Sequence, residues 1–253
     1  MINRSGKIQF VCLGTPSEFP FQQLIRRRRE AKYRLRGLRA IRTNLKTDTL
    51  SSEDLTTLAN ERLDLVGMIQ VIKEGSPGKF SYANLVPPGD EEKWETHKFN
   101  DLGALNLNFE SEIQDLGEQF KKAYYSNGGE DEKEGVILVG FDTKHKFIAE
   151  NSLNELESLA LSGEKNILDK LIQIRRNIDP RYLVGKGKLK EIILHANHFG
   201  ADTIIFDTEL TPTQANIISD ESDLNILDRS QLIIEIFAKH AKTNEGKIQV
   251  RLA

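Results

Sequence analysis

The sequence is poor in cysteine, tryptophan and methionine, with one, one and two of them among 253 residues. The single Cys12 excludes a disulfide within the chain, which suits a reducing compartment. Near the N-terminus the apolar stretch is only a few residues long, too short for a signal peptide or a membrane span. We therefore expect a soluble, cytoplasmic protein without a membrane span.

The motifs of nucleotide hydrolysis are also missing. A phosphate-binding P-loop needs G-x-x-x-x-G-K followed by Ser or Thr, whereas Gly185–Lys188 is followed by Leu189. Asp64–Gly67 fits the D-x-x-G pattern of GTPases, but two fixed positions in four occur readily by chance. No N-K-x-D motif is found. The chain alone is thus expected to be non-catalytic and to bind no cofactor. The alternative is a stand-alone ATP-binding α/β protein that acts on RNA through Gly185–Lys188.

Candidate metal ligands are few. Glu191, His195 and His198 recur at helical spacing (i, i+4, i+7), which could present ligands on one side of a helix. No second cluster of ligand-type residues accompanies them. We therefore interpret the three as a polar outer face.

Positive charge is concentrated early in a chain whose net charge is −3. Between Arg26 and Arg42 stand nine Lys or Arg and one acidic residue, a local charge of +8 that leaves −11 for the rest. Two interpretations stay open, a solvated arginine-rich helix and contact with RNA phosphates. The candidate RNA-binding residues here are Arg26, Arg27, Arg28 and Arg29.

Residues 1–130 predict a small α+β domain. An apolar run predicts a strand at Ile8–Leu13, and Ser51 is a candidate N-cap for a helix that follows. Val66–Ile72 and Phe80–Val86 predict a hairpin, and Glu112–Tyr125 a second helix.

Residues 126–135 are polar and contain glycine, as expected of a linker. Beyond it, short β-branched runs alternate with helical patterns, which predicts a parallel sheet flanked by helices over residues 135–243. Residues 244–253 look like the start of a further helical subdomain. The expected strands are Val136–Phe141, Leu168–Arg175, Thr203–Phe206 and Asn225–Leu227, and the expected helices are Leu153–Leu161, Lys188–Phe199, Thr213–Ile218 and Gln231–Lys242.

The glycine-lysine loop of this second domain is a second candidate contact with nucleic acid. Arg181, Lys186 and Lys188 are expected to meet RNA phosphates from a surface loop, and the alternative is a flexible connection. Further along, Arg229 follows a strand, where it could serve binding or pair with a carboxylate such as Asp207, and we favour the structural pairing.

Seven segments of the chain carry a family resemblance. Those of the second half are Asp179–Leu189, Gly200–Asp207, Glu209–Ala215 and Asp228–Ala238, and those of the first half are Arg34–Arg39, Asp54–Leu65 and Pro87-Pro88. In this order, the segments of the second half resemble the N-terminal domain of the HflX family of ribosome-associated GTPases. The segments of the first half resemble the N-terminal extension of longer family members.

The resemblance implies that the protein functions by binding to the ribosome. Family members bind the large ribosomal subunit and its rRNA, and they split or rescue ribosomes. It further implies that GTP and Mg²⁺ bind to a GTPase domain downstream of this region, and that this region interacts with that domain. ATP-dependent RNA unwinding is also credited to some members, although no ATP motif of this sequence supports it.

Overall fold

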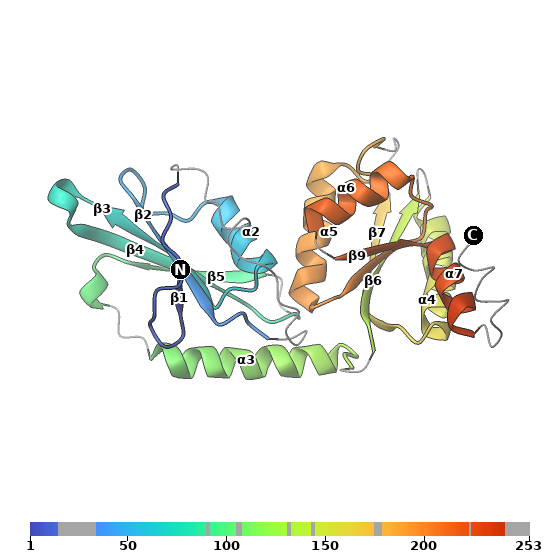
Figure 1. Ribbon diagram of the computed structural model, residues 1–253, viewed down its shortest axis with the longest axis horizontal. Helices are drawn as coiled ribbons and strands as arrows, with labels where there is room; N and C mark the ends of the chain where they lie inside the picture. The colour runs from blue at the N-terminus through green and yellow to red at the C-terminus, as the bar shows by residue number, and fades with distance from the viewer. Residues whose placement is uncertain are drawn as a thin grey trace. The chain divides into compact units, whose positions relative to one another are not determined.

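A computed structural model describes residues 1–14, 34–89, 92–104, 108–130, 133–142, 145–174, 179–222 and 224–240 (Figure 1). The chain divides into two compact units, Met1–Tyr124 and Tyr125–Ala253. The expected RNA-binding residues Arg26–Arg29 and the expected helical start at 244–253 lie outside the described residues.

The first unit contains a five-stranded sheet in the order β1-β2-β3-β4-β5. β2 and β3 are parallel and the other neighbours antiparallel, so the predicted β3–β4 hairpin is confirmed. The elements are β1 (Ile2–Asn3), β2 (Leu38–Asn44), α2 (Ser52–Asn60), β3 (Leu65–Val71), the 3-10 turn Lys73–Gly75, β4 (Pro77–Leu85), β5 (Trp94–Phe99), the 3-10 turn Leu102–Ala104 and α3 (Phe109–Ser126).

Helix α2 begins where its sequence predicts. The Ser51 hydroxyl accepts a hydrogen bond from the Asp54 amide at 3.2 Å, and the Asp54 carboxylate accepts one from the Ser51 amide at 2.7 Å. This reciprocal pair satisfies amides that have no partner within the helix. Leu58 and Ala59 are its buried apolar residues.

The predicted strand at Ile8–Leu13 is wrong. β1 forms instead at Ile2–Asn3, and Ile8 makes only an isolated bridge back to Ile2. Val11 and Leu13 are among the most exposed apolar side chains of the described residues. An apolar run adds a strand only where a neighbour offers both hydrogen bonds and a covered face.

The second unit has a four-stranded, fully parallel sheet in the order β7-β6-β8-β9, which confirms the α/β prediction. Helices α4 and α7 lie on one face of this sheet, and α5 and α6 on the other (Figure 1). The elements are β6 (Gly135–Asp142), α4 (Lys146–Ser162), β7 (Asn166–Ile174), α5 (Lys186–Phe199), β8 (Thr203–Phe206), α6 (Pro212–Ser222), β9 (Asn225–Asp228) and α7 (Arg229–His240).

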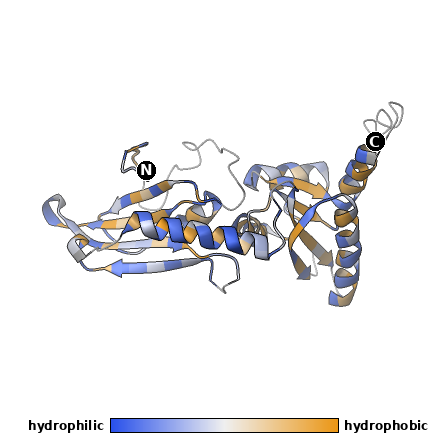
Figure 2. Ribbon diagram, turned by 90° about the horizontal axis from the view of Figure 1, so that it is seen from below, coloured by the Kyte–Doolittle hydropathy of each residue, from blue (hydrophilic) through white to orange (hydrophobic). Residues whose placement is uncertain are grey.

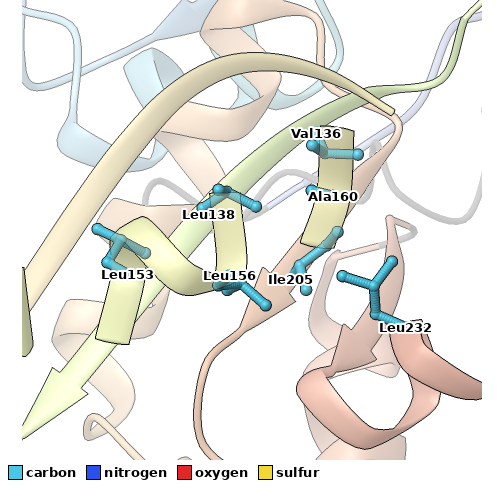
Figure 3. Packing of buried hydrophobic residues seen from close by; sticks show 7 residues of the cluster. All are labelled: Val136, Leu138, Leu153, Leu156, Ala160, Ile205 and Leu232. Carbon is cyan, nitrogen blue, oxygen red and sulfur yellow. The ribbon is translucent and has the colours of Figure 1, made fainter. Parts of the chain in front are cut away.

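The sheet of the second unit is covered on both sides, so its central strands β6 and β8 are nearly continuous apolar runs, whereas the edge strand β7 also carries Asp169 and Lys170. Figure 2 shows this as hydrophobic colouring along the strands. Beneath α4 and α7, the side chains point toward one another and fill the space between helices and sheet (Figure 3). The buried cluster consists of Val136, Leu138, Leu153, Leu156, Ala160, Ile205 and Leu232.

Within the described ranges, no helix is long and apolar enough to cross a bilayer.

Candidate nucleic-acid interface

The loop before α5 is closed by its own backbone. Asp179 and Leu183 each donate an amide hydrogen bond to the other's carbonyl, at 2.9 and 3.0 Å. The Asp179 carboxylate also accepts the amides of Arg181 at 2.9 Å and Tyr182 at 3.0 Å. This is the local turn that aspartate favours, and it fixes the backbone that carries Arg181.

The same loop is anchored from outside. The side-chain amide of Gln214, in the first turn of α6, donates to the Asp179 carbonyl at 3.2 Å. Leu183 is buried at a φ of +60°, a left-handed conformation that costs about 1–3 kcal/mol and persists only where surrounding packing holds it. Gly185, at φ +86°, adopts its conformation without that cost. The alternative of a flexible connection is therefore wrong for residues 179–185.

Sequence reasoning did not identify Gln214 as part of this loop. Its carbonyl oxygen accepts the Thr211 amide at 3.0 Å, while the Thr211 hydroxyl accepts the Gln214 amide at 3.2 Å. The T-x-x-Q spacing is the signal of such a capping box. It predicts the start of α6, but nothing in it indicates the contact with Asp179.

The structure places two of the three predicted cations, Arg181 and Lys186, in solvent and leaves Lys188 partly exposed. Arg181 is exposed, and its guanidinium makes no ion pair or side-chain hydrogen bond within the described part of the chain. The Lys188 ammonium lies 2.7 Å from a Glu191 carboxylate oxygen, and that of Lys186 lies 4.0 Å from Glu221. Their role in binding RNA stays a prediction.

The start of α5 is unusually positive for a helix N-terminus. Gly185 provides no side-chain cap, and no acidic residue lies in the first turn. Lys186 and Lys188 therefore stand beside the positive end of the helix dipole, an arrangement that an external anion would stabilise.

The two lysines do not converge on one point. They are two residues apart on a helix and project to different sides. Leu189 is buried where a P-loop would present a hydroxyl. Divergent cations suit a chain of phosphates better than the compact polyphosphate of one nucleotide, which disfavours the stand-alone nucleotide-binding alternative.

The described part of the basic segment, residues 34–42, makes contacts within the first unit. Arg42 pairs with Asp54 at 2.7 Å, and Arg36 forms an ion pair with Glu61. The Arg39 guanidinium lies 4.1 Å from the centre of the Phe109 ring. All three take part in the fold of the sheet unit, and Arg39 and Arg42 lie in β2, so the interpretation as a solvated helix is wrong for these two. Contact of this segment with RNA phosphates stays a prediction.

Asp64 of the D-x-x-G match is structural. Its carboxylate accepts two hydrogen bonds from Arg4, at 2.7 and 3.0 Å, and one from the Gly37 amide at 2.9 Å. The side chain of Asp64 is completely buried. It joins the N-terminal strand region to the turns before β2 and β3.

The expected pairing of Arg229 is confirmed. Its guanidinium lies 2.7 Å from Glu155 and 3.4 Å from Asp207. The hydrogen bond to Glu155 raises the pKa of Arg229, against the opposing effect of burial. Asp228 accepts the Gln231 amide at 2.9 Å and so caps α7.

The three candidate metal ligands of α5 have other partners. Glu191 pairs with Lys188, and His195 lies 2.7 Å from Asp169 of β7. His198 is buried, so the interpretation as an outer face is wrong for it. Among the described residues, no group of three or more His, Cys, Asp or Glu could hold a metal ion.

The Asp169–His195 contact predicts an acid-sensitive contribution to stability. Burial raises the pKa of Asp169, but hydrogen bonds from His195 and the Lys170 amide outweigh it and hold the pKa below 3.8. Because the pKa of this carboxyl group is lower in the folded than in the unfolded state, its ionisation stabilises the fold at pH values above the unfolded pKa. That contribution is lost as the pH falls through the folded-state pKa. The stability advantage of the wild type over Asp169→Asn should therefore shrink below about pH 4. Urea unfolding of both proteins between about pH 3 and 6 measures it, and a constant difference would contradict the assignment.

Comparisons with known proteins relate the second unit to one family. Residues 150–238 match the family model described as GTP-binding GTPase N-terminal. The GTPase HflX of Lacrimispora saccharolytica is 41% identical over 121 residues, which cover 48% of this chain and 29% of that protein. The GTPase HflX of Escherichia coli K12 is 39% identical over 121 residues, covering 48% and 28%.

A solved GTP-binding protein from Sulfolobus solfataricus, in complex with GDP, shares 23% identity over 47% of this chain and 35% of that chain. The TM-score between the two structures is 0.38. The chain spans less than a third of the length of the curated relatives named above. Residues 150–238 thus match the N-terminal domain model of GTP-binding GTPases, and the second half of the chain is similar to a part of the GTPase HflX proteins.

Proposed function

We propose that this chain is the ribosome-binding N-terminal portion of a cytoplasmic HflX-type GTPase that associates with the large ribosomal subunit and helps to split or rescue ribosomes. Hydrolysis of GTP, with Mg²⁺, belongs in this proposal to a G domain downstream. The observation that carries it is the ordered cationic segment Arg181–Lys188 of the second unit, where Arg181 and Lys186 are exposed and Lys188 is partly exposed, in the region related to HflX proteins.

The physical argument rests on charge and order. Ribosomal RNA presents a dense array of phosphates, and lysine or arginine that neutralises them releases counterions. A loop held by its own hydrogen bonds and by Gln214 loses little conformational entropy on binding. The proposed contact is with the RNA backbone, so it positions the protein without reading a base sequence.

Charge reversal tests the proposal. Lys186→Glu with Lys188→Glu is expected to weaken cosedimentation of the chain with purified large ribosomal subunits by about tenfold and to flatten its salt dependence. Acidic residues are favourable at a helix N-terminus, so the variant should retain the stability of α5. Circular dichroism checks that it does.

A matched control changes two other lysines. Lys146 lies 3.6 Å from Glu150 on α4, and Lys239 pairs with Glu164 at the end of α7. Both helices cover the face of the sheet opposite α5. Lys146→Glu with Lys239→Glu alters the net charge equally and should change binding by less than about twofold. Equal loss in both variants, or none in either, would reject the proposed surface.

A further inference from the structure

We infer that Glu191 and Glu221 set the selectivity of the cationic loop. By holding Lys188 and Lys186 in ion pairs, they favour an extended RNA backbone over single phosphates or free nucleotides. This inference rests on the proposed function and adds two residues of opposite charge to it.

The closer pair lies within α5. Glu191 follows Lys188 by three residues, and the ammonium–carboxylate distance is 2.7 Å. The Lys188 side chain is 41% exposed and that of Glu191 is 65% exposed, so solvent screens the pair and it contributes little to folding stability. A phosphate that binds Lys188 must nevertheless displace or share this carboxylate.

The second pair crosses between helices. Glu221 lies in the last turn of α6 and Lys186 in the first turn of α5, with 4.0 Å between the charged atoms. At that distance and exposure the attraction is weaker than in the closer pair. The hold on Lys186 is therefore the looser of the two.

Arg181 completes the arrangement by contrast. Its guanidinium makes no ion pair with the described residues, whereas Lys186 and Lys188 already have counter-charges. An isolated phosphate can form a new ion pair with Arg181. At Lys186 or Lys188 it would only replace the carboxylate that is already paired with the lysine. A polyanion can occupy all three positions at once, which makes the exchange favourable only for a chain of phosphates.

The alternative is that both carboxylates merely relieve repulsion among the cations of the loop. That role would appear in unfolding measurements and leave RNA affinity unchanged. Selectivity instead predicts tighter binding when the carboxylates are neutralised, a gain that a purely structural role does not produce.

The experiment measures binding of a fluorescein-labelled duplex RNA of about 20 base pairs to the full chain by anisotropy, across a salt series. Glu191→Gln with Glu221→Gln is expected to bind about fivefold more tightly, with a steeper salt dependence. The control is Glu150→Gln with Glu157→Gln, whose partners on the opposite face are Lys146 at 3.6 Å and Lys170 at 2.7 Å. It should change affinity by less than about twofold.

Unlabelled GTP serves as the competitor. It should displace the RNA poorly from the wild type and better from the Glu191→Gln, Glu221→Gln variant. Two results would overturn this inference alone, provided that Lys186→Glu with Lys188→Glu weakens RNA binding. One is an equal gain of RNA affinity in the Glu150→Gln, Glu157→Gln control. The other is competition by GTP that is the same in the wild type and in the Glu191→Gln, Glu221→Gln variant. Failure of the wild type to bind, or indifference to the lysine changes, would overturn the proposed function and this inference together.

Discussion

Replacing Leu156 with alanine is expected to lower the free energy of unfolding of the second unit by about 3 kcal/mol. Leu156 is fully buried and lies between α4 and the sheet (Figure 3). Its cluster includes Leu138 of β6, Ile205 of β8 and Leu232 of α7, so the cavity would border three further elements. Urea unfolding followed by far-UV circular dichroism measures the change.

Leu161→Ala is the matched control, because it removes the same atoms from the same helix. Leu161 is 59% exposed, and the substitution should cost less than about 0.5 kcal/mol. Similar losses in the two variants would mean that Leu156 does not occupy the core position described.

The second large effect is expected in the first unit. Asp64→Ala should cost about 2–3 kcal/mol, because it removes the acceptor of the Gly37 amide and of two hydrogen bonds from Arg4. The figure lies at the lower end of values for buried ion pairs, since Arg4 is half exposed. The only tryptophan, Trp94, lies in β5 of the same unit, so its fluorescence reports this transition.

Two variants sharpen that test. Asp64→Asn keeps an acceptor for Gly37 but loses the charge, and an intermediate loss is expected. Asp115→Ala removes an exposed aspartate from α3 of the same unit and should be nearly neutral. A loss for Asp64→Ala no greater than for Asp115→Ala would show that D-x-x-G here has no structural role.

The fold of the second unit was predictable because the apolar runs in its sequence coincide with the strands that are buried in the structure. β6 and β8 are short apolar runs covered on both faces, and burial of that kind leaves a local signal. α4 nevertheless begins at Lys146 rather than at Leu153, because its first two turns carry the exposed Phe147 and Ile148 outside the apolar repeat.

Strand β2 could not be predicted in the same way. Arg39 and Arg42 interrupt its apolar residues, and contacts outside the strand accommodate their charges, those of Arg39 with the Asn3 carbonyl and the Phe109 ring and that of Arg42 with Asp54. The binding loop shows the same limit. Its cations are visible in the sequence, whereas the pairing of Lys186 with Glu221 depends on how α5 and α6 pack.

The anchor of the cationic loop comes late in the chain. During synthesis, β6, α4 and β7 are complete before β8 exists, so the growing sheet can add its later strands one at a time. The hydrogen bond from Gln214 to Asp179 spans 35 residues and can form only after the start of α6 has left the exit tunnel. A nascent chain therefore presents this loop without its anchor to the ribosome that is making it, and acquires the final shape only some distance further on.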